Sequence, residues 1–148
     1  MLQVITPAIT SNLTTRDTVK QELQITGSAS DSLIDRLIEE ASSKITAYCR
    51  RTTFGLETVR QTEYYPDSVI VLDRDLAPTI TSLTVDGTAS TDYVLDGSLV
   101  RCLSSGKPVS WDSSSTVVID YTTGYTLLGD LPQAVERACI DTVKQLYF

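Results

Sequence analysis

The chain has 148 residues, of which 41% are hydrophobic and 21% charged, and its formal charge is −7. This composition is typical of a globular protein with one core and excludes a disordered chain. No apolar run approaches the ~20 residues that span a bilayer, and no secretory signal opens the sequence. The acidic excess argues against a surface that grips nucleic acid through clustered Lys and Arg, although it suits a wall past which DNA slides without binding.

Residues 1–12 mix Thr, Ser and Pro with a few aliphatic side chains, and they predict an extended arm. The arm is interpreted either as a frayed terminus or as a segment that docks on a neighbouring copy. Two helices are predicted over residues 14–52. The first is capped by Thr14 or Thr15 and ends at Gly27.

The second, longer helix begins after Ser28 or Ser30 and ends near Arg51. Steps of three and four residues predict one apolar face. The basic pair Arg50 and Arg51 favours a helix C-terminus, where the helix dipole stabilises positive charge. Contact with a partner or with passing DNA is the alternative interpretation of this pair. The predicted apolar face consists of Leu33, Ile34, Leu37, Ile38, Ala41, Ile45, Tyr48 and Cys49.

Residues 56–125 are rich in Thr, Val, Ile and Tyr, with turn residues every eight to twelve positions. Short strands joined by such turns, among them Asp86-Gly87 and Asp96-Gly97, predict an antiparallel β-meander. Its aromatic side chains could stack on bases, but few cations surround them, so a place in the sheet core or in a subunit contact is favoured. These aromatic residues are Tyr64, Tyr65, Trp111 and Tyr121.

The last helix is predicted over residues 131–148, with Pro132 in its first turn and two aromatic residues, Tyr147 and Phe148, at its end. The predicted fold is therefore α+β. It is a small bundle of a short, a long and a C-terminal helix, with the antiparallel β-meander inserted between the second and last helices. We expect residues 1–148 to form a single domain.

Enzyme chemistry finds little support in these residues. The chain has no histidine, which removes the commonest general base and the usual catalytic triads. Its three cysteines, Cys49, Cys102 and Cys139, form no CxxC pair and predict small buried apolar side chains. Phosphate-binding glycine motifs are absent. The sequence predicts neither catalysis nor a metal or other cofactor.

Two groups of neighbouring carboxylates were the remaining chemical candidates. Glu39 and Glu40 fall on the polar face of the long helix, where solvent surrounds both. Asp73 and Asp75 flank Arg74 in a predicted turn and lack the further oxygen ligands of a calcium loop. We interpret both groups as charged surface.

Three stretches resemble the head–tail connector (adaptor, or head-completion) proteins of tailed double-stranded-DNA bacteriophages. The first begins at Leu13-Thr14-Thr15 and continues through the long helix, the second runs from Val69–Leu72 to the Val85-Asp86-Gly87 turn, and the third joins Tyr121-Thr122-Thr123-Gly124-Tyr125 to Leu131-Pro132 and the last helix. Together they follow the family order over nearly the whole chain. Family members often continue past the last helix, whereas this chain stops at Phe148.

The resemblance implies a structural virion protein at the head–tail interface, assembled in the host cytoplasm. It implies a homo-oligomeric ring, typically a dodecamer, that binds the portal protein and offers a platform to a downstream neck, stopper or tail protein. Double-stranded DNA would pass through the lumen without specific binding, and no membrane would be involved. A different neck or tail component, such as a stopper or tail-completion protein, is the alternative, and a packaging nuclease is a more distant one.

By the same resemblance the last helix contacts the portal and the strand-connecting loops face a neighbour or the downstream partner. The residues expected at the portal are Leu131, Val135, Arg137, Lys144, Leu146, Tyr147 and Phe148. Those expected at a neighbour or downstream partner are Asp73, Arg74, Asp75 and Trp111.

Overall fold

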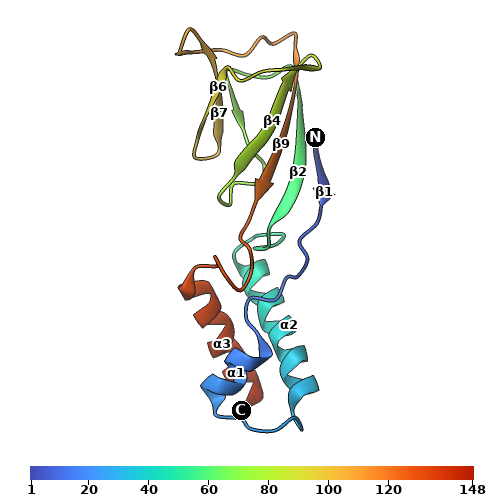
Figure 1. Cartoon of the computed structure of the whole chain (residues 1–148), viewed down its shortest axis with the longest axis vertical. Helices are drawn as coiled ribbons and strands as arrows, with labels where there is room; N and C mark the ends of the chain where they lie inside the picture. The colour runs from blue at the N-terminus through green and yellow to red at the C-terminus, as the bar shows by residue number, and fades with distance from the viewer. The chain divides into compact units, whose positions relative to one another are not determined.

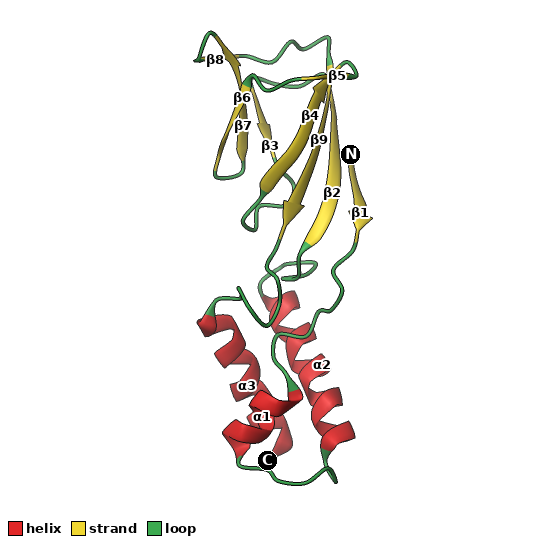
Figure 2. Ribbon diagram, in the orientation of Figure 1, coloured by secondary structure: helices red, strands yellow, loops and turns green.

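The computed structural model describes all 148 residues and contains three helices and nine strands (Figures 1 and 2). The mixed α/β content and the antiparallel pairing confirm the coarse fold prediction. No helix combines the length and the apolar character needed to cross a membrane. The helices are α1 (Arg16–Leu23), α2 (Asp31–Tyr48) and α3 (Gln133–Tyr147); the strands are β1 (Leu2–Thr6), β2 (Glu57–Tyr64), β3 (Val69–Val71), β4 (Thr79–Val85), β5 (Thr88–Ala89), β6 (Tyr93–Asp96), β7 (Leu99–Ser104), β8 (Lys107–Val109) and β9 (Thr116–Thr123).

The chain packs as two compact units. Met1–Pro7 and Glu57–Gly124 form one, here called the β unit, and Ala8–Leu56 with Tyr125–Phe148 form the other, the helical unit. Each unit is built from segments far apart in sequence. The expectation that residues 1–148 act as a single connector domain stays a prediction.

The β unit holds two antiparallel sheets. The larger has the order β1-β2-β9-β4-β5, and the smaller has the order β3-β7-β6 with β8 also paired to β7. The last strand, β9, therefore lies between β2 and β4, and the predicted meander is not confirmed. Residues 116–123 of β9 pair with β2 and residues 117–122 also pair with β4, so hydrogen bonds on both sides place this strand inside the sheet.

The core of the β unit draws on both sheets. The larger sheet contributes Val59, Val117 and Ile119, and the smaller one contributes Ile70 and Val100, all of them buried. These positions alternate with less buried ones along their strands, as expected for sheets with one buried face.

The N-terminal arm of the sequence analysis is partly a strand. Leu2–Thr6 are extended as expected, but they pair antiparallel with β2 at the edge of the larger sheet. Only Leu2 packs against the core cluster, and the other four residues are exposed. β1 is thus held mainly by its backbone hydrogen bonds to β2.

In the helical unit α2 packs against α3, with α1 beside both. The predicted cap of α1 is confirmed at Thr15, whose side chain accepts a hydrogen bond from Thr18 N at 3.2 Å. The predicted end at Gly27 is wrong. α1 ends at Leu23 because Gln24 adopts a left-handed backbone (φ 56°) and the last carbonyls are already bonded there.

The apolar face predicted for α2 was too broad. Ile34, Leu37, Ile38 and Ala41 are buried, but Leu33 and Tyr48 are exposed, Tyr48 by 89%. α2 ends at Tyr48, so Cys49 is exposed as well, whereas Cys139 is buried. The prediction of buried cysteines is therefore wrong for Cys49, because the chain leaves the helix before that position can pack against α3.

Candidate interaction surfaces

The end of α3 carries an aromatic pair. The rings of Tyr147 and Phe148 meet edge to face, with centroids 5.1 Å apart and planes at 78°. Tyr147 is half-buried and its hydroxyl lies 3.3 Å from Ser30 Oγ, so it is tied to the start of α2. Phe148 is 82% exposed and Leu146 is 37% exposed. A fixed tyrosine thus lies between two exposed apolar side chains, and we call Leu146–Phe148 the aromatic tip.

The other residues expected at the portal do not form one surface. Leu131 is only 8% exposed, so its side chain belongs to the core of the helical unit, and Val135 is half-buried. Arg137 is exposed but donates to Glu22 Oε2 at 3.0 Å and lies 3.2 Å from Asp141 Oδ1. Lys144 is exposed near the aromatic tip. Of these four residues, only Lys144 lies near the aromatic tip.

An apolar groove lies at the other end of α3, between its first turns and the end of α2. Its volume is about 460 Å³. This groove was not predicted, although Ala134 and Ala138 are small residues four positions apart, which leaves room between two packed helices. The groove is lined by Lys44, Ile45, Tyr48, Cys49, Ala134, Val135 and Ala138.

In the β unit, Arg74 is part of the structure rather than a free surface cation. Its backbone N–H donates to Tyr121 Oη at 3.2 Å, and its Nε donates to Glu57 Oε1 at 3.1 Å. Glu57 is only 6% exposed, so this ion pair neutralises a buried carboxylate. The side chains of Asp73 and Asp75, on either side, are exposed. Of this predicted contact group, only the two aspartates present charge to solvent.

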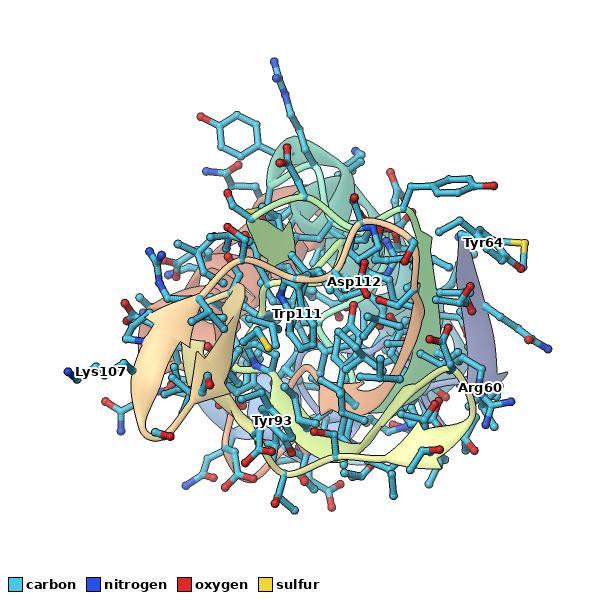
Figure 3. The ribbon with its side chains drawn as sticks, turned by 90° about the horizontal axis from the view of Figure 1, so that it is seen from above. Arg60, Tyr64, Tyr93, Lys107, Trp111 and Asp112 are labelled. Carbon is cyan, nitrogen blue, oxygen red and sulfur yellow. The ribbon has the colours of Figure 1, made fainter.

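Trp111, also expected at a contact, is 5% exposed and points into the β unit (Figure 3). Its Nε1 donates to Val100 O at 3.1 Å, which satisfies the one polar group of the buried indole. Trp111 therefore serves as core.

Charge is distributed unevenly between the two units. The β unit has ten acidic and four basic residues, while the helical unit has nine and eight. Four exposed aspartates without an ion pair, Asp67, Asp86, Asp92 and Asp112, lie in loops at one end of the β unit, where β2, β4 and β7 end and β9 begins. Hydrogen bonds from Ser114 lower the pKa of Asp112 and keep it ionised. We call this end of the β unit the acidic loop end.

Two of the three thiols are partly or fully buried. Burial raises the pKa of the Cys139 and Cys102 thiols, which disfavours their nucleophilic thiolate forms. No three His, Cys, Asp or Glu side chains lie close enough to hold a metal ion. The surfaces described are thus an apolar tip, an apolar groove and acidic loops.

Comparison with known proteins agrees with this description. A family model described as phage gp6-like head-tail connector protein matches residues 14–92, which include α1, α2 and strands β2 to β5. A chain of the solved structure entitled "Neck of empty GTA particle computed with C6 symmetry" is 19% identical with a TM-score of 0.62, and the match covers 99% of this chain and 83% of that one. The two chains share a fold. No curated protein matches the sequence.

Proposed function

Because this chain belongs to the family of phage gp6-like head–tail connector proteins, we propose that it is a structural subunit of the neck of a phage-like particle. Copies assemble into a ring beneath the portal, which extends the DNA channel and carries the next neck or tail protein. The family is one of structural connector proteins and not of enzymes.

The family match carries this proposal. It runs without interruption from α1 to the residue before β6, so it includes parts of both the helical unit and the β unit. The fold likeness over 99% of the chain to a protein from a particle neck supports the same assignment. A sixfold-symmetric neck accommodates rings whose copy number is a multiple of six, which is compatible with a dodecamer.

The two units suit different contacts of such a ring. The aromatic tip of the helical unit is the kind of anchor that fills a pocket in a partner, and we assign it to the portal. The acidic loop end of the β unit suits a downstream neck or tail protein with a complementary basic surface. The acidic excess of the β unit also disfavours adhesion of passing DNA, since clustered cations are what phosphates bind.

Removal of Leu146–Phe148 tests the portal contact. Leu146 and Phe148 are exposed and Tyr147 contributes one hydrogen bond to Ser30, so the truncated protein should keep its fold, which helical circular dichroism and Trp111 fluorescence report. Particles made with it should lack tails and the connector ring. The matched control is Gln145→Ala, an exposed change one residue before the truncation.

Crosslinking in particles identifies the neighbours. Crosslinks to the portal on one side and to a neck protein on the other are expected. Normal DNA-filled, tailed particles from the truncated chain would count against the portal assignment. Crosslinks to tail proteins without any to the portal would instead indicate a stopper or tail-completion protein.

A further inference from the structure

The outer edge of β1 has hydrogen-bonding groups without partners. β1 is an edge strand that pairs with β2 alone. Thr62 N–H donates to Met1 O at 2.8 Å, which fixes the phase of the ladder. Because antiparallel residues alternate between bonding across the ladder and pointing away from it, Leu2 and Val4 direct their N–H and C=O groups to the open side.

This edge lacks two of the usual protections against pairing, charge and proline, and its one irregularity is a register shift between Val4 and Thr6. Proteins commonly guard an exposed edge with charged side chains, proline or a covering loop, and β1 reads Leu-Gln-Val-Ile-Thr, without charge or proline. Val4 and Ile5 are 41% and 45% exposed. An uncharged edge with exposed aliphatic side chains is a ready site for strand addition.

The opposite edge of the same sheet is also partly open. β5 pairs only with Thr84 and Val85 of β4, and Ser90 N–H reaches Leu83 O at 3.0 Å. Residues 79–82 of β4 have no neighbour on their outer side, and they are uncharged as well. A bulge at Thr81 keeps this open stretch short.

The directions of the two edges are complementary. Three antiparallel steps lead from β1 through β2 and β9 to β4, so β1 and β4 run in opposite directions. A rotation about an axis parallel to the strands keeps every strand direction. The β4 of a copy related by such a rotation therefore runs antiparallel to β1 of the first copy. The sheet would continue from copy to copy with its alternation intact, and such a heterologous contact closes into a ring when the rotation closes.

We propose that β1 of one copy pairs with residues 79–82 of β4 in the next copy, so that the larger sheets join edge to edge around the ring. This inference rests on the proposed ring and names its subunit interface. The pairing within one chain also gives its register. Gln3, Arg60, Asp120 and Ser82 are successive partners in one row across the sheet, so Gln3 lies opposite Ser82 of the neighbouring copy. In this register the outward groups of Val4 meet the open stretch of β4, whereas Leu2 falls opposite Leu83, whose C=O already accepts Ser90 N–H.

A pair of cysteines tests this register. Gln3→Cys and Ser82→Cys are made together in a Cys49→Ser background, which removes the exposed native thiol. Within one chain the two positions are three strands apart, about 14 Å, so a short bifunctional maleimide joins them only between chains. Covalent multimers up to the full ring are expected, both in particles and in concentrated purified protein. The matched control, Gln3→Cys with Lys107→Cys, places the second thiol at an exposed position of the other sheet and should give none.

A proline at Val4 tests the backbone edge directly. Val4→Pro removes an outward N–H while leaving the β1–β2 ladder in place, and Val4→Ala removes the same side chain but keeps the N–H. Val4→Pro should abolish the multimers or weaken self-association about tenfold or more, since it removes a ladder bond and blocks its neighbours, whereas Val4→Ala should keep them. Trp111 fluorescence confirms that both variants are folded.

The edge pairing would be overturned if the two Val4 variants behaved equally, or if neck rings gave no multimers with the cysteine pair. Either result would leave the proposed function standing. If purified protein formed the multimers but the necks of particles lacked this chain, the edge pairing would be supported and the proposed function contradicted.

Discussion

Tyr121 Oη lies 3.1 Å from Gln61 Oε1 inside the β unit, and the tyrosine hydroxyl donates to the amide oxygen. Both side chains are fully buried. The same Gln61 oxygen accepts Asp73 N–H at 2.9 Å, while Gln61 Nε2 donates to Val71 O at 2.9 Å and to Glu63 Oε1 at 2.6 Å. One amide thus fixes the loop after β3 to β2 and β9.

Replacement of Gln61 by Leu should be strongly destabilising. It removes the acceptor of the Tyr121 O–H and of Asp73 N–H and the donor to Val71 O, so we expect the free energy of unfolding to fall by about 2–4 kcal/mol. Urea unfolding followed by Trp111 fluorescence measures the change. Gln145→Leu, the same exchange at an exposed position of α3, should change stability by less than about 0.5 kcal/mol. Equal effects of the two substitutions would contradict the role of the Gln61 network.

The β unit should lose stability at alkaline pH. Burial raises the pKa of Tyr121 from 10.0 to about 12, so between these values the folded protein holds a proton that the unfolded chain releases. The stabilisation is therefore complete below pH 10 and disappears as the pH rises through about 12. Tyr121→Phe should flatten this decline relative to wild type in urea unfolding at successive pH values. Tyr65→Phe, at an exposed tyrosine, should leave the decline unchanged.

Arg74→Gln should destabilise the β unit whether or not any partner is present. It leaves the Glu57 carboxylate, only 6% exposed, without its cation, and breaking such a buried pair typically costs about 3–5 kcal/mol. Because the Arg74 guanidinium is itself partly exposed, we expect the free energy of unfolding to fall by an amount at or below the lower end of this range. Arg101→Gln, at a half-buried arginine with no ion pair, is the control and should have a small effect. A variant of Arg74 that is fully stable but defective in assembly would show that this arginine serves a contact instead.

Gly55→Ala should destabilise the helical unit. A Cβ at Gly55 would lie 2.7 Å from Ala8 Cβ and 2.9 Å from Thr10 O, and neither atom is the flexible end of a side chain. Such overpacking typically costs about 1–3 kcal/mol. Helical circular dichroism during thermal unfolding reports the change. Gly129→Ala, whose Cβ would meet nothing closer than Thr126 O at 3.7 Å, should be nearly neutral. A neutral Gly55→Ala would mean that residues 8–10 do not pack as described.

The sequence by itself determined the local elements and the family. The three-and-four spacing of apolar residues located α2, turn residues between runs rich in Thr, Val, Ile and Tyr indicated short strands, and Thr15 and Pro132 marked helix starts. These features depend on neighbours within a few positions, which the sequence contains directly. The connector resemblance followed from the order of the same elements, and the family match bears it out.

Only the tertiary structure decided which strands pair and which candidate residues are buried. β9 lies between β2 and β4, Trp111 and Leu131 are buried, and Arg74 pairs with Glu57. A strand can pair with any strand of compatible pattern, and the choice is made by the total burial of both sheet faces rather than by local spacing. The same holds for the open edge of β1 and the groove beside Ala134 and Ala138, since a surface is defined by what the rest of the chain leaves uncovered.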